Sequence, residues 1–270
     1  MESNKKRIAV CFYGQVRFYE GLNSLYSKWN DLFENFKIDF FISTWDDMDK
    51  EKITLKFRKT RFFDHDKITK GWEIGNTRKM AYLFSNAVRL KQEYELEQDF
   101  GYDWVFMTRP DIIYEHQYFE KSIEKLSNLD SSKPTVGVLD LPSIDENGHQ
   151  RIMMDYGFIF SSEAVDMHGS LYNYFYLLKK YKKVKDREYR EGGHWIHTFY
   201  FLLNDFHIEQ INLPSIMVRP YRDLETIKQY IDSPELFKKV GTNACTWKLI
   251  DGNTAERDGV KIPFKERIVK

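Results

Sequence analysis

Two apolar runs, separated by a stretch of helix length, open this chain and constrain its fold more than any other feature. The first is RIAVCFY at residues 7–13, and the second is IDFFISTW at residues 38–45. Both are rich in β-branched and aromatic side chains, which favour buried strands. The stretch between them, from Gly14 to about Phe36, suits a glycine turn followed by a helix. Together they predict a βαβ unit with parallel strands and a right-handed crossover.

The same alternation continues along the chain. A short strand near 61–63 precedes a long amphipathic helix that begins at Asn76, a good N-cap, and that we expect Gly101 to end. Further strands are expected in DWVFMTRP, TVGVLDLP, RIMMDYGFIFSS and HIEQINLPSIMVRPY, and further helices at 163–181 and 194–206. Residues 115–129 are expected to form either another helix or a loop with helical turns. The sequence therefore predicts an α/β fold, a mostly parallel central sheet flanked by helices in a single domain. We assign residues 1–222 to this domain and residues 223–270 to an extension packed on it.

Composition narrows the class of protein. The chain has 270 residues, of which 42% are hydrophobic, and its formal net charge of +0 argues against a dedicated nucleic-acid binder. Cys11 and Cys245 are too far apart for a disulfide framework or a zinc spacing, so we expect a reducing, cytoplasmic compartment. The apolar run near the N-terminus is read as a strand rather than a signal peptide, and no run is long enough for a transmembrane segment.

Polar residues follow three of the predicted strands at their carboxyl ends. They are Gly14, Gln15 and Arg17 after the first, Ser43, Thr44, Trp45 and Asp46 at the end of the second, and Arg109, Pro110 and Asp111 after the strand in 103–108. Because the carboxyl ends of parallel strands share one edge of a sheet, where open α/β sheets bind ligands, we expect these groups to converge. Gly14 permits close approach of a ligand, and Arg17 suits a phosphate. The pattern is neither G-x-G-x-x-G nor a P-loop.

The Arg109-Pro110-Asp111 segment has two interpretations. One is a salt bridge that closes a loop, and the other is a site for an anionic ligand, with Asp111 as an oxygen ligand for Mg²⁺ or Mn²⁺. Two further carboxylates are candidates for the chemistry. Asp155, where a later strand begins, either binds an acceptor hydroxyl or is a turn residue. Glu191, before two glycines, is either a general base on a loop or the last charge of a solvated run.

Other catalytic signatures are weak. His194 and His197 share a helix face, but no third ligand of matching spacing accompanies them, and H-E-x-x-H is absent. A zinc enzyme is therefore disfavoured. The sequence also lacks G-x-S-x-G, so a hydrolase has no support.

The segments IAVCFYGQVR, IDFFISTW and DWVFMTRPDIIY together resemble the small nucleotide-sugar glycosyltransferases of GT-A, Rossmann-like fold found in viruses and bacterial surface-polysaccharide clusters. DYGFIFSSEAVDMHGSLYNYF looks like the acceptor-side strand and helix of that family. HWIHTFYFLLNDFHIEQI looks like its later helix and strand. The resemblance covers about residues 7–220.

The resemblance implies a hexosyl- or pentosyltransferase that moves a sugar from a UDP- or GDP-linked donor to a hydroxyl of a glycan or other acceptor. By position, Gly14, Gln15 and Arg17 would line the nucleotide and diphosphate, Thr44 and Trp45 would lie near the base or ribose, and Arg78 would reach the donor phosphates. Asp111 would stand at the second acid of the family's D-x-D metal motif, whereas Arg109 replaces the first acid. Dependence on Mn²⁺ or Mg²⁺ is therefore left open. An inverting reaction would use Asp155 or Glu191 as its base.

Two rival interpretations remain. A non-catalytic or degenerate nucleotide-sugar-binding protein is favoured somewhat by the missing first acid. A phosphoryl or nucleotidyl transferase would need more clustered carboxylates than Asp46, Asp47 and Asp111 offer. The sequence leaves open the donor nucleotide and whether the chain forms a homo-oligomer. If the chain is viral, the expected compartment is the host cytoplasm.

Overall fold

The computed structural model describes most of the chain up to residue 217 and three short strands beyond it. The described residues are 5–16, 19–46, 49–70, 76–114, 116–129, 132–139, 141, 143–144, 150–151, 155, 157–178, 183–184, 187–188, 193–213, 215–217, 248–251, 254–257 and 260–263. Arg17, Asp47 and Glu191 lie outside these residues, so the predictions made for them stay untested, as does the division of the chain at residue 222.

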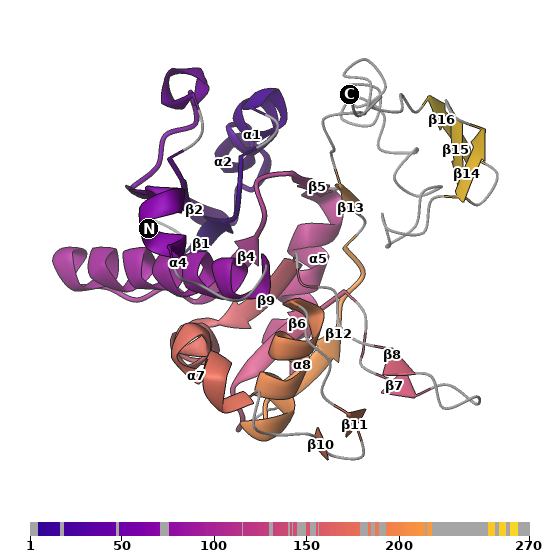
Figure 1. Ribbon diagram of the computed structural model, residues 1–270. Helices are drawn as coiled ribbons and strands as arrows, with labels where there is room; N and C mark the ends of the chain where they lie inside the picture. The colour runs from indigo at the N-terminus through magenta and orange to yellow at the C-terminus, as the bar shows by residue number, and fades with distance from the viewer. Residues whose placement is uncertain are drawn as a thin grey trace.

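A seven-stranded sheet forms the centre of the fold, in the order β12-β6-β9-β4-β1-β2-β3 (Figure 1). Its strands are β1 (Lys6–Tyr13), β2 (Phe36–Trp45), β3 (Lys59–Phe63), β4 (Trp104–Thr108), β6 (Thr135–Val138), β9 (Gly157–Ser161) and β12 (His207–Gln210). Only β9 runs antiparallel to its neighbours within this sheet, β4 and β6. The expected mostly parallel α/β sheet is therefore confirmed.

Helices cover both faces of this sheet. One face carries α4 (Asn76–Gln98), α6 (Ser162–His168), α7 (Leu171–Leu178) and α8 (Gly193–Leu203), and the other carries α1 (Tyr19–Tyr26), α2 (Trp29–Leu32) and α5 (His116–Ser127). Alternate residues of β1 enter the two cores: Cys11 and Tyr13 pack toward α4, whereas Val10 and Phe12 pack toward α1 and α2. Figure 1 shows α4 crossing the sheet. No helix among the described residues is both long and apolar enough to span a membrane.

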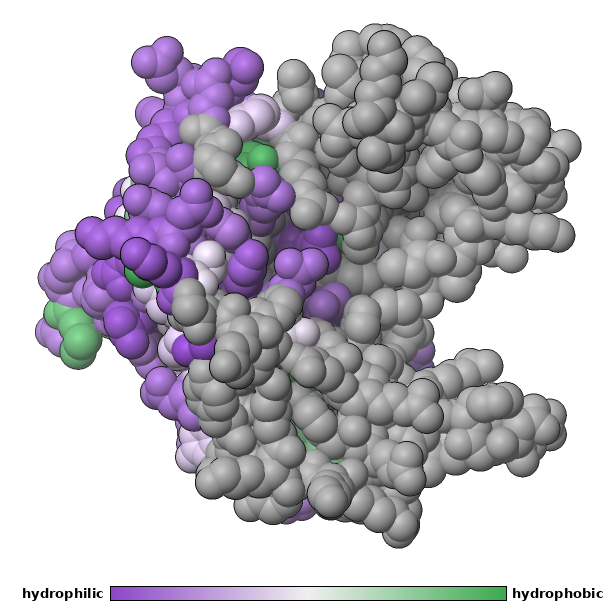
Figure 2. All heavy atoms as spheres, viewed as in Figure 1, coloured by the Kyte–Doolittle hydropathy of each residue, from purple (hydrophilic) through white to green (hydrophobic). Residues whose placement is uncertain are grey.

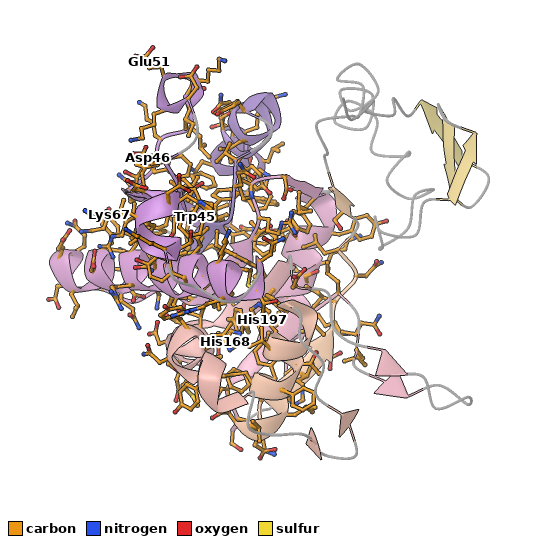
Figure 3. The ribbon with its side chains drawn as sticks, in the orientation of Figure 1. Trp45, Asp46, Glu51, Lys67, His168 and His197 are labelled. Carbon is orange, nitrogen blue, oxygen red and sulfur yellow. The ribbon has the colours of Figure 1, made fainter. Side chains whose placement is uncertain are left out.

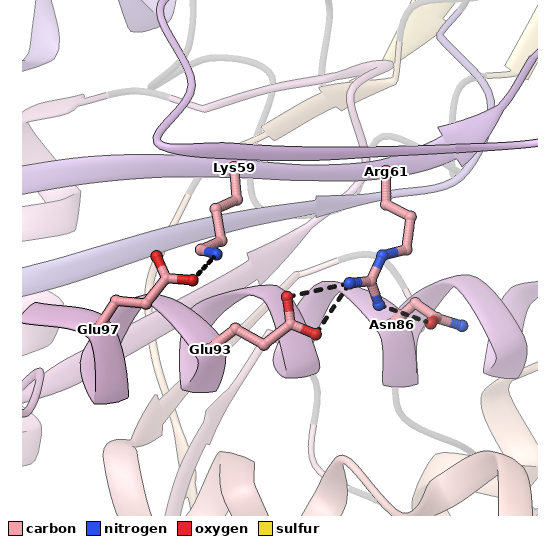
Figure 4. Close-up of polar contacts among 5 residues, drawn as sticks. All are labelled: Lys59, Arg61, Asn86, Glu93 and Glu97. Atoms are coloured by element: carbon pink, nitrogen blue, oxygen red, sulfur yellow. Dashed lines mark hydrogen bonds and ion pairs between the residues drawn. The ribbon is translucent and has the colours of Figure 1, made fainter.

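The edge strand β3 is held to α4 by polar side chains (Figure 4). Lys59 forms an ion pair with Glu97, and the Nη2 of Arg61 donates to both carboxylate oxygens of Glu93 at 2.8 and 3.0 Å. The Nη1 of Arg61 also donates to Asn86. Hydrophilic residues cover most of the described surface on the face that Figure 2 shows.

Two helix boundaries differ from those expected. The long helix α4 ends at Gln98 rather than at Gly101, because Asp99 takes the left-handed conformation that terminates it, with φ of 53°. The helix expected at 163–181 is instead the pair α6 and α7, broken near Gly169. A Cβ on Gly169 would lie 2.7 Å from Cγ1 of Val88, so the glycine lets the chain approach α4 closely.

Smaller elements complete the described structure. They are η1 (Lys50–Lys52), α3 (His65–Thr69), β5 (Ile112–Tyr114), β7 (Ser143–Ile144), β8 (Gln150–Arg151), β10 (Lys183–Val184), β11 (Arg187–Glu188), β13 (Ser215–Met217), β14 (Lys248–Asp251), β15 (Thr254–Arg257) and β16 (Val260–Pro263). β13 pairs with β5, directly after the Arg109–Asp111 segment, and β14 to β16 form a small sheet of their own.

Candidate functional site

The carboxyl ends of β1, β2 and β4 lie level with one another. In the sheet register Tyr13 is opposite Ser43, and Phe12 is opposite Thr108. Gly14 continues β1 with φ of +112°, a conformation that residues with a side chain rarely adopt, and a Cβ there would lie 4.0 Å from Cγ of Arg109. The sheet thus brings Gly14, the end of β2 and Arg109 to one edge.

Arg109 and Asp111 form a two-pronged ion pair at this edge. Nε of Arg109 donates to Oδ1 of Asp111 at 2.9 Å, and Nη2 donates to Oδ2 at 2.7 Å. Asp111 is 1% exposed and Arg109 is 22% exposed. Pro110 between them ends the strand, so both side chains start from a stiff turn. The guanidinium of Arg109 is therefore partly accessible to solvent, whereas the carboxylate that it pairs with is buried.

Asp155 lies at the same edge, on the β9 side of β4, and its charge acts on Arg109. Because β9 is antiparallel to β4, with Thr108 opposite Gly157, the start of β9 and the nearby Asp155 lie at the edge where β4 ends. The hydroxyl of Tyr13 donates to the backbone carbonyl of Asp155, which fixes this bend. Sequence reasoning did not identify Tyr13, although its place as the last residue of the first strand was a usable signal.

The pKa values at this edge agree with a compact group of charges. Burial raises the pKa of the Tyr13 hydroxyl well above its usual value, and the charge of Asp155 adds to this. Burial opposes the charged form of Arg109, but Asp111 and then Asp155 outweigh it and raise the pKa of the guanidinium. Arg109 is therefore a permanent positive charge that faces two carboxylates.

Two buried tyrosines support the segment that carries Asp111. Tyr26 on α1 donates to the backbone carbonyl of Ile112 at 3.0 Å, and the hydroxyl of Thr108 donates to Tyr114 at 3.0 Å. Gly157 leaves room for this arrangement, since a Cβ there would lie 2.5 Å from the Tyr114 hydroxyl. These contacts join β4, β5 and β9 around the site, and they were not predicted from the sequence.

The end of β2 combines a polar and an aromatic part. Ser43 and Thr44 are fully buried, and neither hydroxyl has a hydrogen-bond partner among the described residues. Trp45, labelled in Figure 3, is 6% exposed. Its ring stacks on Tyr82 of α4, with ring centres 6.2 Å apart and an interplanar angle of 8°. This packing makes Trp45 part of the core, and contact with a base or ribose stays a prediction.

Two further residues predicted to bind the ligand, Gln15 and Arg78, belong to β1's extension and to α4. Gln15 follows Gly14 and is exposed. Arg78, in the first turn of α4, donates to the Tyr172 hydroxyl at 3.3 Å, and its guanidinium lies 5.8 Å from the centre of that ring. Arg78 thus links α4 to α7, and its contact with donor phosphates stays a prediction.

The helix α8 uses His197 for packing. His197 lies beside His168 of α6, with Nδ1 and Nε2 2.8 Å apart, and both rings are fully buried (Figure 3). Burial lowers the pKa of His168 well below its usual value, and His197 adds to this shift. The partner of His197 is therefore a residue of another helix, which the spacing to His194 did not indicate.

The described residues do not fit a divalent metal at Asp111. Both oxygens of this carboxylate accept hydrogen bonds from Arg109, whereas Mg²⁺ and Mn²⁺ need such oxygens as ligands. No group of three or more His, Cys, Asp or Glu residues in the described part of the chain could hold a metal ion. Of the two possibilities that the sequence left open, Mn²⁺ or Mg²⁺ at Asp111 finds no further ligands among the described residues.

Comparisons with known protein families and with curated proteins find no match by sequence. Among solved structures, the chain is similar to a galactosyltransferase, LgtC, in complex with donor and acceptor sugar analogues, with 12% identity, a TM-score of 0.44 and coverage of 76% of this chain and 73% of that one. It is also similar to a glycosyltransferase involved in glycosylation of the major capsid of PBCV-1, with 9% identity, a TM-score of 0.40 and coverage of 87% and 90%. A third similar structure is 4-diphosphocytidyl-2C-methyl-D-erythritol synthase from Anaerococcus prevotii, with 11% identity, a TM-score of 0.39 and coverage of 87% and 100%. Nothing about reaction or donor follows from likenesses this remote.

Proposed function

We propose that this chain is a glycosyltransferase, which moves a sugar from a nucleoside-diphosphate sugar to a hydroxyl of a glycan or other acceptor. The observation that carries the proposal is the grouping of Gly14, Arg109, Asp111 and Asp155 at the carboxyl edge of the sheet. A glycine turn, a guanidinium and a nearby carboxylate suit a diphosphate and a reacting hydroxyl. The sequence resemblance, which includes these residues, supports the same reaction.

The first half of the reaction requires a place for negative charge. When the bond between the sugar carbon and the diphosphate oxygen breaks, its electron pair stays on that oxygen. The guanidinium of Arg109 is held in place by Asp111, so it can stabilise this charge without rearrangement. We assign Gly14, Gln15, Arg17 and Arg78 to the nucleotide and its phosphates, as the resemblance implies.

The second half of the reaction requires a base when it proceeds with inversion. The acceptor oxygen forms the new bond to the sugar carbon, and its proton passes to a carboxylate. Asp155 is the described carboxylate that fits this role, because its charge acts on both Tyr13 and Arg109. Glu191, outside the described residues, is the alternative base. We assign the buried hydroxyls of Ser43 and Thr44 to hydrogen bonds with the nucleoside. Trp45 would contact the base or ribose only after its ring moves away from Tyr82.

A non-catalytic nucleotide-sugar-binding protein is the second candidate. The observation that favours it is the ion pair itself, because a structural salt bridge that closes the loop would have the same geometry. Both candidates predict nucleotide binding, and they differ in turnover.

A thermal-shift screen with UDP-, GDP-, CMP- and dTDP-sugars tests the proposal. A ligand that binds only the folded state raises Tm by mass action, so we expect one nucleotide class, UDP or GDP, to raise it. Release of the nucleoside diphosphate from that donor, measured with a panel of glycan acceptors, then separates an enzyme from a binding protein. No shift with any nucleotide sugar, in folded protein, would contradict both candidates.

A matched pair of variants sharpens the screen. Arg109→Gln should reduce the ligand-induced rise in Tm, because the guanidinium that faces the diphosphate is lost. Arg58→Gln is the control. Arg58 is also paired with a buried carboxylate, that of Asp39, but Asp39 lies in the amino half of β2, away from the carboxyl edge. The control should leave the ligand-induced rise at the wild-type value, even where it lowers the Tm of the free protein. Equal losses in both variants would contradict the placement of the diphosphate at Arg109.

A further inference from the structure

The guanidinium of Arg109 occupies the position that a cation would take at this site. Its Nε and Nη2 atoms lie 2.9 and 2.7 Å from the two oxygens of Asp111. It also interacts electrostatically with Asp155 and Tyr13. Asp111 is almost completely buried beneath it, at 1% exposed. The charge that balances these carboxylates is therefore supplied by the protein itself.

A divalent ion would have to displace this guanidinium. Mg²⁺ and Mn²⁺ bind through carboxylate and other oxygen ligands, whereas each oxygen of Asp111 accepts a hydrogen bond from Arg109 and the carboxylate is only 1% exposed. An ion placed beside the pair would also be repelled by the guanidinium at short range. Pro110 restricts the backbone between the two residues, so the pair is built into the turn and is not an adjustable surface contact.

The guanidinium retains donors for a ligand. Its bonds to Asp111 engage Nε and one hydrogen of Nη2, whereas an arginine carries five N–H donors in a planar fork. The side chain is 22% exposed, so the group has access to solvent while its partner has none. Planar forks of this kind match the oxygens of a phosphate.

We propose that the site binds its donor diphosphate without a divalent cation, with Arg109 as the fixed positive charge and Asp111 as the residue that positions it. The proposal rests on the proposed function, and it specifies the cofactor requirement of the same site. As the sugar leaves, the electron pair of the cleaved bond remains on the diphosphate oxygen, and the guanidinium stabilises that oxygen in place of a metal.

Two measurements test this directly, the first on the wild-type protein and the second on the wild type and Asp111→Asn. The first is the rise in Tm, or the Kd from calorimetry, for UDP and GDP in EDTA and in MnCl₂. We expect the same affinity in both buffers. The second is the electron paramagnetic resonance signal of free Mn²⁺ during titration with the nucleotide-free protein. We expect the wild type and Asp111→Asn to bind Mn²⁺ to the same extent, because Asp111 is not a metal ligand. A nucleotide affinity that EDTA removes, or Mn²⁺ binding that Asp111→Asn abolishes, would overturn the proposal.

Variants of Arg109 supply the complementary measurement. Arg109→Gln should weaken binding of UDP or GDP by about tenfold or more, as expected for loss of a charged hydrogen-bonding partner, and MnCl₂ should not restore it. Arg109→Lys, which keeps the charge and loses the fork, should be intermediate. Restoration of the Arg109→Gln affinity by MnCl₂ would show that a metal can act at the site and would overturn the proposal. If no nucleotide binds the wild type at all, the proposed function fails, and the Mn²⁺ titration still decides whether Asp111 holds a metal.

Discussion

At the scale of single residues, the same pair of side chains occurs at two places in the sheet. Arg109 binds Asp111 at the carboxyl edge, and Arg58 binds Asp39 in the amino half of β2, where Tyr102 donates a second hydrogen bond to Asp39 at 2.9 Å. Both carboxylates are buried, at 1% and 4% exposed. An arginine paired with a buried aspartate is therefore not in itself a sign of function. The position of Arg109 beside Gly14 and Asp155 distinguishes it.

Asp111→Asn tests the structural part of this pair. The substitution leaves a largely buried guanidinium without its counter-charge, so we expect the free energy of unfolding to fall by about 2–3 kcal/mol. Asp46→Asn, at the end of β2, removes a carboxylate from a pair with Lys50 whose members are 44% and 48% exposed. That control should cost less than about 1 kcal/mol. Chemical denaturation of both variants measures the difference, and equal costs would contradict the buried character of the Arg109–Asp111 pair.

At the scale of elements, α4 organises one face of the molecule. Its side chains reach β3 through Glu93 and Glu97, and reach α6 through Lys91. Lys91 is fully buried, and its ammonium group binds Glu95 at 2.8 Å, Asp166 at 2.9 Å and the Ser162 hydroxyl at 2.6 Å. Burial of an ammonium group without such partners has a large free-energy cost, so this cluster determines how α6 packs on α4.

Lys91→Met tests that cluster. The methionine fills a similar volume but leaves Glu95 and Asp166 without their shared cation, so we expect a loss of about 2–3 kcal/mol in unfolding free energy. Lys59→Met is the matched control, because Lys59 pairs with the half-exposed Glu97 of the same helix (Figure 4). It should cost less than about 1 kcal/mol. Urea denaturation followed by circular dichroism compares the two, and an equal loss would show that burial of Lys91 has little energetic consequence.

At the scale of the whole molecule, His168, which lies against His197, links stability to pH. The two rings join α6 to α8 inside an aromatic cluster that includes Phe84, Phe158 and Phe201. Because burial lowers the pKa of His168 in the folded state, the unfolded chain binds a proton that the folded chain does not. The contribution of His168 to stability is therefore fully present above the unfolded pKa of about 6.5, and it is lost as the pH falls below that value.

We expect the unfolding free energy to decrease by up to about 1.4 kcal/mol for each pH unit below about 6.5 through this one group. In His168→Phe, which keeps a ring in the cluster and cannot be protonated, the decrease should be smaller by that amount. Denaturation of the wild type and of His168→Phe at about pH 5, 6 and 7 measures both slopes. A wild-type slope in His168→Phe would contradict the assignment.

The sequence by itself determined the α/β class and the parallel βαβ unit. It also predicted that polar residues would meet at one edge of the sheet. These follow from local properties, because apolar periodicity and strand direction depend on neighbours in the chain. It also placed Arg109 next to Asp111, but left open whether they form a salt bridge or a metal site.

Only the tertiary structure decided the remainder. It brought Asp155 to Arg109 through the antiparallel strand β9, paired His197 with His168, and packed Trp45 against Tyr82. Each of these arrangements brings together residues that are far apart in the sequence, so no local pattern could indicate it. The physical reason is that burial and charge pairing are properties of the assembled core, where the partner of a side chain is set by sheet order and helix packing.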